Sequence, residues 1–157
     1  MATKKKTKVA KKATTKKTAR TAVATTKKAS KKASTSKAAP TAKPLGPYTP
    51  VVRAGDWIIV SGQLGIADGK VVSGGVAAQT TKAIENLKGQ LASVGANLSD
   101  VSKTLCFLTD MDTFATFNTA YVAGFGNSRP ARSTIGVASL PFGGAVEIEA
   151  WAYKPLR

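Results

Sequence analysis

The residues with the clearest chemical potential lie on two predicted strands near the C-terminal end of the chain. On the first, Ile135 and Val137 are apolar alternate positions, which predicts that they face a core and that Arg132 points to the opposite side. On the second, Glu147 and Glu149 alternate with apolar residues. The pattern therefore predicts one arginine and two glutamates on the sheet face turned away from the helices. By spacing alone, such a group is most often a solvated cross-strand ion pair, with a binding site as the less common alternative.

The composition excludes several kinds of chemistry. The chain has no histidine, which rules out a Ser-His-Asp triad, a histidine metal site and histidine acid–base catalysis. Its single cysteine, Cys106, rules out an internal disulfide and a zinc site built from several thiolates. Catalysis would have to come from carboxylates, arginine, tyrosine, hydroxyls, one thiol, backbone groups and water, and no metal or organic cofactor is expected.

The elements that position these residues follow from periodicity and turn signals. The sequence predicts an α+β domain in which helices cover one face of a mixed sheet. Gly95 is expected to end the first helix, and Asp112 or Thr113 to cap the second, which carries an aromatic stripe at Phe114, Phe117, Tyr121 and Phe125. The predicted extended segments are 48–53, 57–61, 70–72, 100–109, 132–139 and 146–151, and the first helix is predicted at 76–94.

The charge divides the chain into two parts. Residues 1–43 hold 15 of the 24 basic residues and no acidic ones, whereas residues 44–157 hold the other 9 basic residues and all 8 acidic ones, so the net charges are +15 and +1. We expect 1–43 to be a disordered Lys/Ala/Thr-rich tail and 44–157 to be the folded domain. Similar lysine-rich tails occur in linker histones and some bacterial nucleoid proteins.

Dense positive charge without aromatic residues predicts salt-dependent binding to phosphates of a nucleic acid or another polyanion, without sequence specificity. A tail that only aids solubility is the alternative. The sequence shows neither a signal peptide nor a transmembrane run, so the protein is expected to be cytoplasmic, with nucleoid association through the tail and no membrane partner. The expected nucleic-acid-binding residues are Lys4, Lys5, Lys6, Lys8, Lys11, Lys12, Lys16, Lys17, Arg20, Lys27, Lys28, Lys31 and Lys32.

Short segments spread over residues 46–153 carry a family resemblance. Each one is weak, but their order and spacing together resemble the Rid/YjgF (RidA-like) family of reactive-intermediate imine deaminases. The strongest is Arg129-Pro130-Ala131-Arg132-Ser133, followed by Leu140-Pro141 and Val146-Glu147-Ile148-Glu149-Ala150. The others are Gly46-Pro47-Tyr48, Val60-Ser61-Gly62-Gln63, Gln79-Thr80, Asn86-Leu87, Asp100-Val101-Ser102-Lys103, Phe107-Leu108-Thr109-Asp110-Met111 and Phe117-Asn118-Thr119-Ala120-Tyr121.

The resemblance implies a chorismate-mutase-like subunit that assembles into a homotrimer with clefts between subunits. It implies a 2-iminobutanoate/2-iminopropanoate deaminase-type hydrolase, which converts enamine or imine intermediates of the 2-aminoacrylate type to 2-keto acids and ammonia. Arg132 would bind the substrate carboxylate with its planar fork of donors. Glu147 would hold and relay the attacking water.

Other positions match the family's cleft more loosely. Tyr48 and Asn118 match residues that line it, Gly62 would contribute backbone groups, and Ser61 belongs to the family's Ser-Gly-Gln segment. Thr134 stands where many members have a cysteine, so it offers a hydroxyl for a water in place of a thiol. This departure keeps a second hypothesis open, a non-catalytic trimer that binds small carboxylates. A third is a nucleic-acid-associated protein whose trimer only multiplies the tails.

Overall fold

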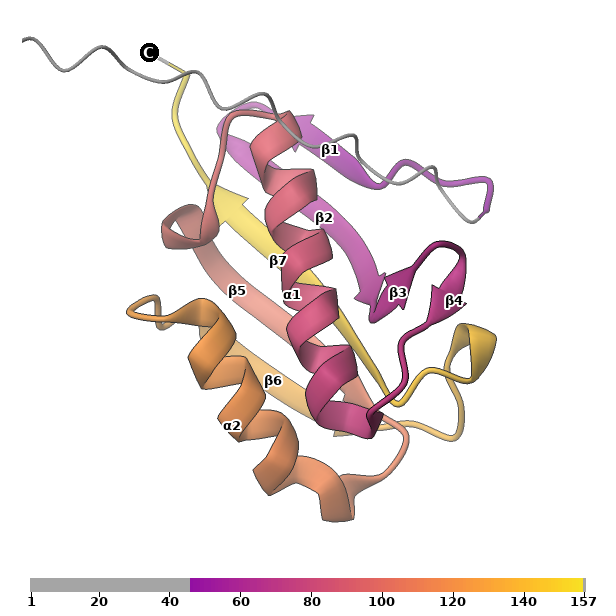
Figure 1. Ribbon diagram of the computed structural model, residues 1–157. Coiled ribbons are helices and arrows are strands. Elements are labelled where there is room, and N and C mark those ends of the chain that lie inside the picture. Colours follow the sequence, from indigo (N-terminus) through magenta and orange to yellow (C-terminus); the bar gives the residue numbers. More distant parts are fainter. Residues whose placement is uncertain (1–45, 157) are drawn as a thin grey trace, which may run out of the picture. The chain divides into compact units, whose positions relative to one another are not determined.

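A mixed five-stranded sheet with two helices on one face forms the described part of the chain, as the sequence predicted. The computed structural model describes residues 46–156. The strand order is β1-β2-β7-β5-β6, in which only the β5–β6 pair is parallel. Both helices lie in front of the sheet in Figure 1. The bounds are β1 Val51–Ala54, β2 Trp57–Leu64, α1 Gly75–Ser93, β5 Val101–Leu108, α2 Phe114–Phe125, β6 Ala131–Gly136 and β7 Val146–Tyr153.

The core lies between the helices and one face of the sheet. Alternate residues of β2 and β7 are buried because successive side chains of a strand point to opposite faces. Buried Val, Leu and Ile side chains stabilise such a layer by about 1.5–3 kcal/mol each, and buried alanines by less. From the sheet they include Ile58, Val60, Val146, Ile148, Ala150 and Ala152, and from α1 they include Ile84, Leu87 and Leu91.

The end of α1 agrees with the predicted glycine cap. Gly95 has a φ of 74°, the left-handed conformation that glycine adopts without a steric penalty. The N–H of Gly95 donates to Ala92 O at 3.1 Å and the N–H of Ala96 donates to Leu91 O at 2.8 Å, which is the Schellman arrangement. The helix therefore ends where the sequence predicted.

Two local features differ from the sequence-based expectation. The predicted strand at 70–72 is β4, Lys70–Val71, which pairs with β3, Ile66–Ala67, in a separate two-stranded sheet. The second helix is preceded by a short 3-10 turn at Met111–Thr113, and Asp110 caps this turn by accepting from the N–H of Asp112. Thr113 is the N-cap residue of α2, but its side chain caps no N–H group of the helix.

The residues of the predicted basic tail, Lys4 to Lys32 among them, lie outside the described residues. Within 46–156, neither helix combines the length and apolar character needed to cross a membrane.

Candidate functional site

Arg132 lies against the aromatic side of α2. Its guanidinium carbon is 4.6 Å from the centre of the Tyr121 ring, 5.5 Å from that of Phe117 and 5.7 Å from that of Phe114. Cation–π contact with several rings stabilises a partly desolvated guanidinium. The aromatic stripe predicted for the second helix therefore supports the arginine as well as the core.

The hydrogen bonds of Arg132 leave much of its donor capacity free. Nη2 donates to Oδ1 of Asn118 at 2.8 Å, which brings together two of the predicted site residues. Among residues 46–156 the ion pairs are Lys82–Glu85 and Lys154–Asp100, so no described carboxylate pairs with Arg132. A partly buried arginine held by a neutral amide and by rings is suited to bind an anion that the single chain does not supply.

The prediction that Arg132 and the two glutamates share one sheet face is wrong. Arg132 pairs with the fully buried Thr104 and faces α2, whereas Ile135 is 48% exposed on the other face. The strand β6 lies at the edge of the sheet, and none of its side chains is fully buried. The long stem and flat head of arginine can cover apolar rings while the charge reaches solvent, so an arginine can occupy the face that alternation assigns to isoleucine.

Glu147 lies on the open face of the sheet, the side without helices, as predicted. Burial raises the pKa of this carboxyl, and the neighbouring Glu149 carboxylate raises the pKa further. The Glu147 side chain packs against Gly62 and occupies the space that a Cβ at position 62 would take. Glu149 accepts a hydrogen bond from Nε1 of Trp151 at 2.7 Å. The Glu147 carboxyl, in contrast, has no described hydrogen-bond partner.

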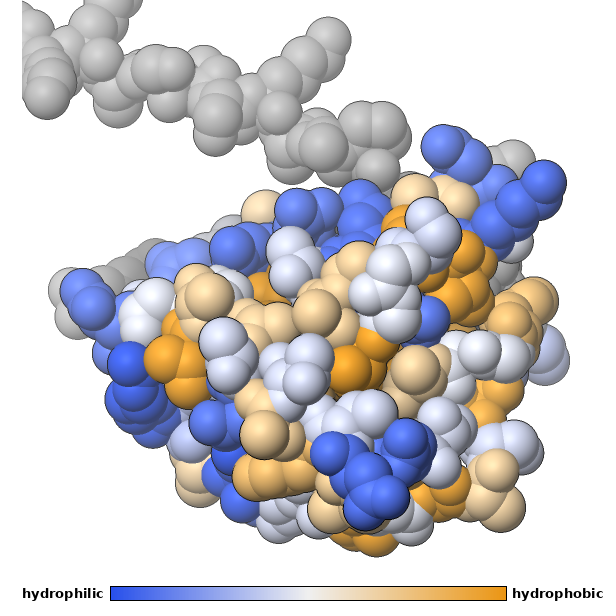
Figure 2. Space-filling model, turned by 60° about the horizontal axis from the view of Figure 1, so that its bottom comes forward, coloured by the Kyte–Doolittle hydropathy of each residue, from blue (hydrophilic) through white to orange (hydrophobic). Residues whose placement is uncertain are grey.

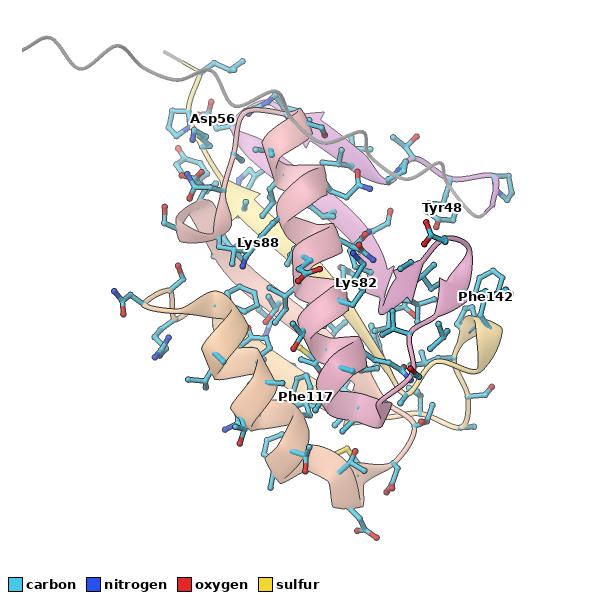
Figure 3. All side chains as sticks on the ribbon, viewed as in Figure 1. Tyr48, Asp56, Lys82, Lys88, Phe117 and Phe142 are labelled. Atoms are coloured by element: carbon cyan, nitrogen blue, oxygen red, sulfur yellow. The ribbon has the colours of Figure 1, made fainter. Side chains whose placement is uncertain are left out.

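Ser61 precedes Gly62 on β2, and its hydroxyl connects it to the segment that contains Tyr48. The Ser61 hydroxyl donates to Thr49 O at 2.8 Å, which ties the segment before β1 to the end of β2. Tyr48 is exposed, and Figure 3 places it well away from Phe117, one of the rings that surround Arg132. The predicted site residues thus form two half-sites: Arg132, Asn118 and Thr134 on the helix side, and Glu147, Gly62 and Ser61 on the other, with Tyr48 in the segment that Ser61 ties to β2.

Thr134 carries an unpartnered hydroxyl. Its Oγ1 is buried and is the one such side-chain atom among residues 46–156 that has no hydrogen-bond partner. It pairs across the ladder with Cys106, which is fully buried and whose pKa is raised by burial to about 11. The thiol is therefore a core group in its neutral form, whereas the threonine hydroxyl is available to a ligand or a water.

Sequence reasoning missed a pair of buried hydroxyls beside Arg132. Oγ1 of Thr104 and Oη of Tyr121 are 2.7 Å apart and buried between β5 and α2. Tyr121 was predicted only as part of an apolar stripe, and Thr104 only as part of a buried strand. No local pattern reveals that the two side chains meet, because they are 17 positions apart and come from different elements.

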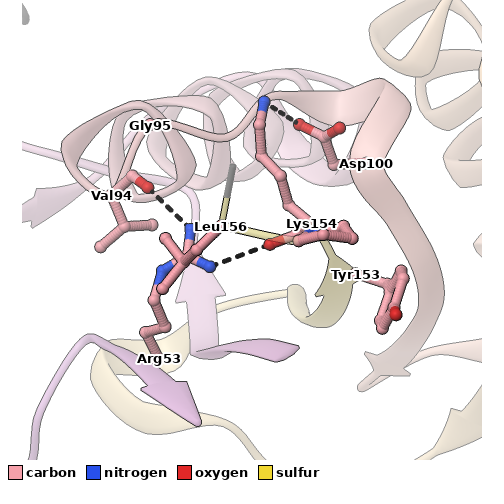
Figure 4. Close-up of a pocket in the computed structure, with 8 residues that line it drawn as sticks. Arg53, Val94, Gly95, Asp100, Tyr153, Lys154 and Leu156 are labelled. Carbon is pink, nitrogen blue, oxygen red and sulfur yellow. Dashed lines mark hydrogen bonds and ion pairs between the residues drawn. The ribbon is translucent and has the colours of Figure 1, made fainter. Parts of the chain in front are cut away.

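A pocket of about 510 Å³ lies at the C-terminal end of α1 (Figure 4). Its polar groups are already paired: Arg53 donates to Lys154 O at 3.0 Å and to Val94 O at 3.1 Å, and Lys154 Nζ bonds Asp100 Oδ2 at 3.0 Å. These contacts join β1, the end of α1 and the end of β7. Because its charged groups are satisfied by the fold, this pocket has a structural role.

The open face of the sheet is rich in exposed apolar side chains. Contiguous apolar surface of this kind marks an interaction site in most soluble proteins. Figure 2, viewed from the end where α2 begins, shows a different surface, on which apolar patches alternate with polar residues. The open-face residues are Val52, Trp57, Ile59, Ile135, Trp151 and Tyr153, all between 42% and 48% exposed.

Comparison with known proteins gives consistent relatives. The family model described as Endoribonuclease L-PSP matches residues 36–154. A 2-iminobutanoate/2-iminopropanoate deaminase of Bos taurus is 43% identical over 123 residues, which is 77% of this chain and 88% of the relative. A RutC family protein of Pyrococcus horikoshii is 41% identical over 114 residues, covering 71% of this chain and 90% of that protein.

Solved structures agree with the sequence relatives. The crystal structure of the YjgF gene product of E. coli is 40% identical, with a TM-score of 0.67, and the match covers 74% of this chain and 93% of that one. Since a family model and close relatives match the same segment, the chain belongs to the Rid/YjgF family, whose model carries the description endoribonuclease L-PSP.

Proposed function

We propose that the protein hydrolyses small 2-imino acids and their enamine tautomers to 2-keto acids and ammonia. The observation that carries this proposal is Arg132, a partly buried arginine with free donors and no described carboxylate partner. The names of the deaminases that are 40–43% identical to this chain support the same reaction. Water adds to the C=N carbon, and the nitrogen leaves as ammonia after it accepts protons.

Arg132 binds the carboxylate of the substrate. Asn118 takes one N–H of Nη2, so one of the two donor pairs of the fork, Nε with Nη2 or Nη1 with Nη2, stays free to donate two parallel hydrogen bonds to a carboxylate. The rings of Phe117 and Tyr121 exclude water on one side of the guanidinium, which strengthens these charge-assisted bonds. This grip fixes the imine carbon relative to the carboxylate.

In this proposal, Glu147 positions the attacking water and transfers the protons. Because its pKa is raised, part of the Glu147 population is protonated nearer to neutral pH than an ordinary glutamate, as a general acid–base group requires. It can position a water on one face of the imine carbon, take a proton from that water as it attacks, and pass a proton to the departing nitrogen. Gly62 leaves the room that this carboxyl occupies.

The remaining predicted residues shape the cleft in this proposal. The unpartnered hydroxyl of Thr134 lies two residues after Arg132 and holds a water or the substrate nitrogen by a hydrogen bond. Ser61 belongs to the half-site that contains Glu147, with Tyr48 in the segment that Ser61 ties to β2, and Asn118 belongs to the half-site that contains Arg132.

The two half-sites meet only if two copies of the chain meet. Arg132 and Glu147 lie on opposite faces of one sheet, so a single chain cannot direct both at one small substrate. The exposed apolar residues of the open face favour self-association, in which the face with Glu147 packs beside the α2 side of a neighbour. We therefore propose a homotrimer whose clefts lie between subunits.

Substitution of Arg132 tests the function. Imine is generated by a serine or threonine dehydratase, and release of the keto acid is followed in the presence of wild type, Arg132→Ala and Arg132→Lys. Loss of a bidentate charged contact of about 3 kcal/mol predicts a fall in kcat/KM of about 100-fold for Arg132→Ala. Lysine keeps the charge but not the fork, so Arg132→Lys should recover little.

Equal rates with and without the protein would reject the deaminase proposal. If the protein then binds 2-oxobutanoate saturably through Arg132 without turnover, the non-catalytic carboxylate-binding trimer becomes the better description.

Binding of nucleic acid is the second candidate function, and the net charge of +15 on residues 1–43 favours it. It would place the protein in the cytoplasm, at the nucleoid. Affinity of the full chain for duplex DNA should fall with salt, with a slope of log K on log salt of about −0.9 per phosphate neutralised. A chain beginning at residue 44 should lose this binding, and equal binding by both chains would remove the tail from the account.

Incubation of the protein with RNA is a further test, because the family description names an endoribonuclease. Intact RNA after incubation is the expected result. Cleavage of RNA that Arg132→Ala abolishes would favour a nuclease function over the proposed deaminase.

A further inference from the structure

We propose that Thr104 and Tyr121 are positioning residues, which fix the plane of the Arg132 guanidinium through a buried hydroxyl–hydroxyl bond. The proposal rests on the proposed function only for the identity of the anion that Arg132 binds. It gives a role to a buried polar pair that the reaction described above does not use.

The three residues form a compact unit between β5, β6 and α2. Thr104 and Arg132 are direct neighbours in the parallel ladder, and both side chains point toward α2. Tyr121 reaches across from α2, with its ring 4.6 Å from the guanidinium carbon and its Oη 2.7 Å from Thr104 Oγ1. Thr104 is fully buried and Tyr121 is 6% exposed.

The hydroxyl pair fixes the orientation of the ring. A buried hydroxyl without a partner costs about 1–3 kcal/mol, so the Tyr121 ring is held where its Oη reaches Thr104. Phe125 stacks on the other side, with ring centroids 4.4 Å apart. The ring that supports Arg132 is thereby fixed at its polar end by the sheet and on its outer face by the helix.

The guanidinium is then held on two sides and open on a third. The Tyr121 ring supports its flat face, and Asn118 Oδ1 accepts from Nη2 at one edge. The remaining edge of the guanidinium fork, which joins Nη2 to Nε or to Nη1, has no described partner and binds the ligand in this proposal. A carboxylate needs both donors of that edge in one plane, so tilting of the guanidinium weakens one of the two bonds.

Tyr121 itself does not transfer protons in this arrangement. Burial raises its pKa to about 12, although the hydrogen bond to Thr104 opposes the rise. The phenol therefore stays neutral throughout the working range of the protein. Its hydroxyl serves orientation, which predicts an effect on binding of the carboxylate rather than on the pH profile.

The test uses 2-oxobutanoate, the keto acid that hydrolysis of 2-iminobutanoate yields, as a stable carboxylate probe. Its Kd is measured by calorimetry for the full-length wild type, Tyr121→Phe, Thr104→Val and the double variant, together with kcat and KM for imine hydrolysis. Loss of one positioning hydrogen bond of about 1.4 kcal/mol predicts a Kd about tenfold higher in each single variant. KM should rise by a similar factor and kcat should change less, because the carboxylate grip is made before and during the reaction.

Coupling and rescue separate positioning from a merely structural role. The double variant should bind no worse than either single variant, because the two residues act as one unit. Thr104→Ser keeps the hydroxyl and should bind as wild type does. Ile84→Val removes core packing of α1 against Gly124 of α2, so it should lower Tm but leave Kd unchanged.

The possible results distinguish failure of the positioning role from failure of the proposed function. Tight binding by wild type and equally tight binding by Tyr121→Phe and Thr104→Val would overturn the positioning role alone. A Kd in Ile84→Val as weak as in Tyr121→Phe would also overturn it, because general loosening of α2 would then explain the effect. If wild type neither binds 2-oxobutanoate nor hydrolyses the imine, the positioning role and the proposed function fall together.

Discussion

At the residue scale, Arg132 shows how a fold presents an unpaired charge. A carboxylate from the same chain would satisfy the guanidinium and close the site. Here a neutral amide from Asn118 and the rings of α2 hold the side chain, and its remaining donors stay free. In the proposed function, a substrate carboxylate supplies the missing charge at little cost in reorganisation.

Glu147 gives a prediction on stability and pH. A folded-state pKa above the ordinary value of about 4.3 means that the folded protein binds the proton more tightly than the unfolded chain. The stabilisation from this proton is complete below the ordinary pKa and is lost as the pH rises through the raised pKa. Glu147→Gln, which cannot ionise, should therefore have a higher Tm than wild type at pH 7, by no more than a few degrees because the group is only half-buried.

The difference in Tm should close below about pH 4, where the glutamate is protonated in both states. The two proteins are compared at one protomer concentration, because assembly shifts Tm. Glu85→Gln on the exposed side of α1 is the matched control and should show no such pH-dependent gain. A wild type that is more stable than Glu147→Gln at pH 7 would contradict the raised pKa.

The sequence predicted the elements that carry the candidate site residues better than the faces to which their side chains point. The placement of Glu147 followed from alternation, because β7 is a central strand with one fully buried face. The placement of Arg132 did not, because an edge strand leaves both faces partly exposed and the amphipathic arginine fits either. The Thr104–Tyr121 pair is a tertiary contact, and a single sequence carries no signal for such a contact.

At the scale of elements, the ends of α1 and β7 are joined by Arg53. The strand β1, the C-terminal end of α1 and the end of β7 meet at this point, and Glu147 lies near the opposite end of β7. The sequence predicted the type of each major element because each has a clear period and a turn residue such as Gly95. It missed the β3–β4 pair and the cap at Asp110, which depend on a few local hydrogen bonds.

Arg53→Ala tests the structural role of this junction and of the pocket in Figure 4. Two partly buried hydrogen bonds from a charged donor are lost, so the free energy of unfolding should fall by about 2–3 kcal/mol. Binding of 2-oxobutanoate should not change. Lys82→Ala, which removes an exposed ion pair within α1, is the control and should cost at most about 0.5 kcal/mol. Weaker binding of 2-oxobutanoate by Arg53→Ala at full folding would identify the pocket as a ligand site.

At the scale of the whole molecule, the charge of residues 1–43 and the placement of the site residues favour different partners, a polyanion and a second copy of the chain. Residues 44–157 carry a net charge of only +1, so the +15 of residues 1–43 is a property of one segment rather than of the fold. In the described part, the predicted site residues are divided between two faces of the sheet, so one chain alone does not bring them together. A site completed between copies accounts for that division and for the exposed apolar face together.

Complementation between two inactive variants tests this central claim most directly. Arg132→Ala and Glu147→Gln are each expected to lose the deaminase activity, because every cleft in either homotrimer lacks one of the two groups. When both chains are co-expressed and purified as mixed trimers, roughly a quarter of the clefts should combine an intact Arg132 with an intact Glu147 from the neighbouring chain. The account predicts that the mixed protein regains activity in that proportion, and a mixture that stays as inactive as its parents would contradict it.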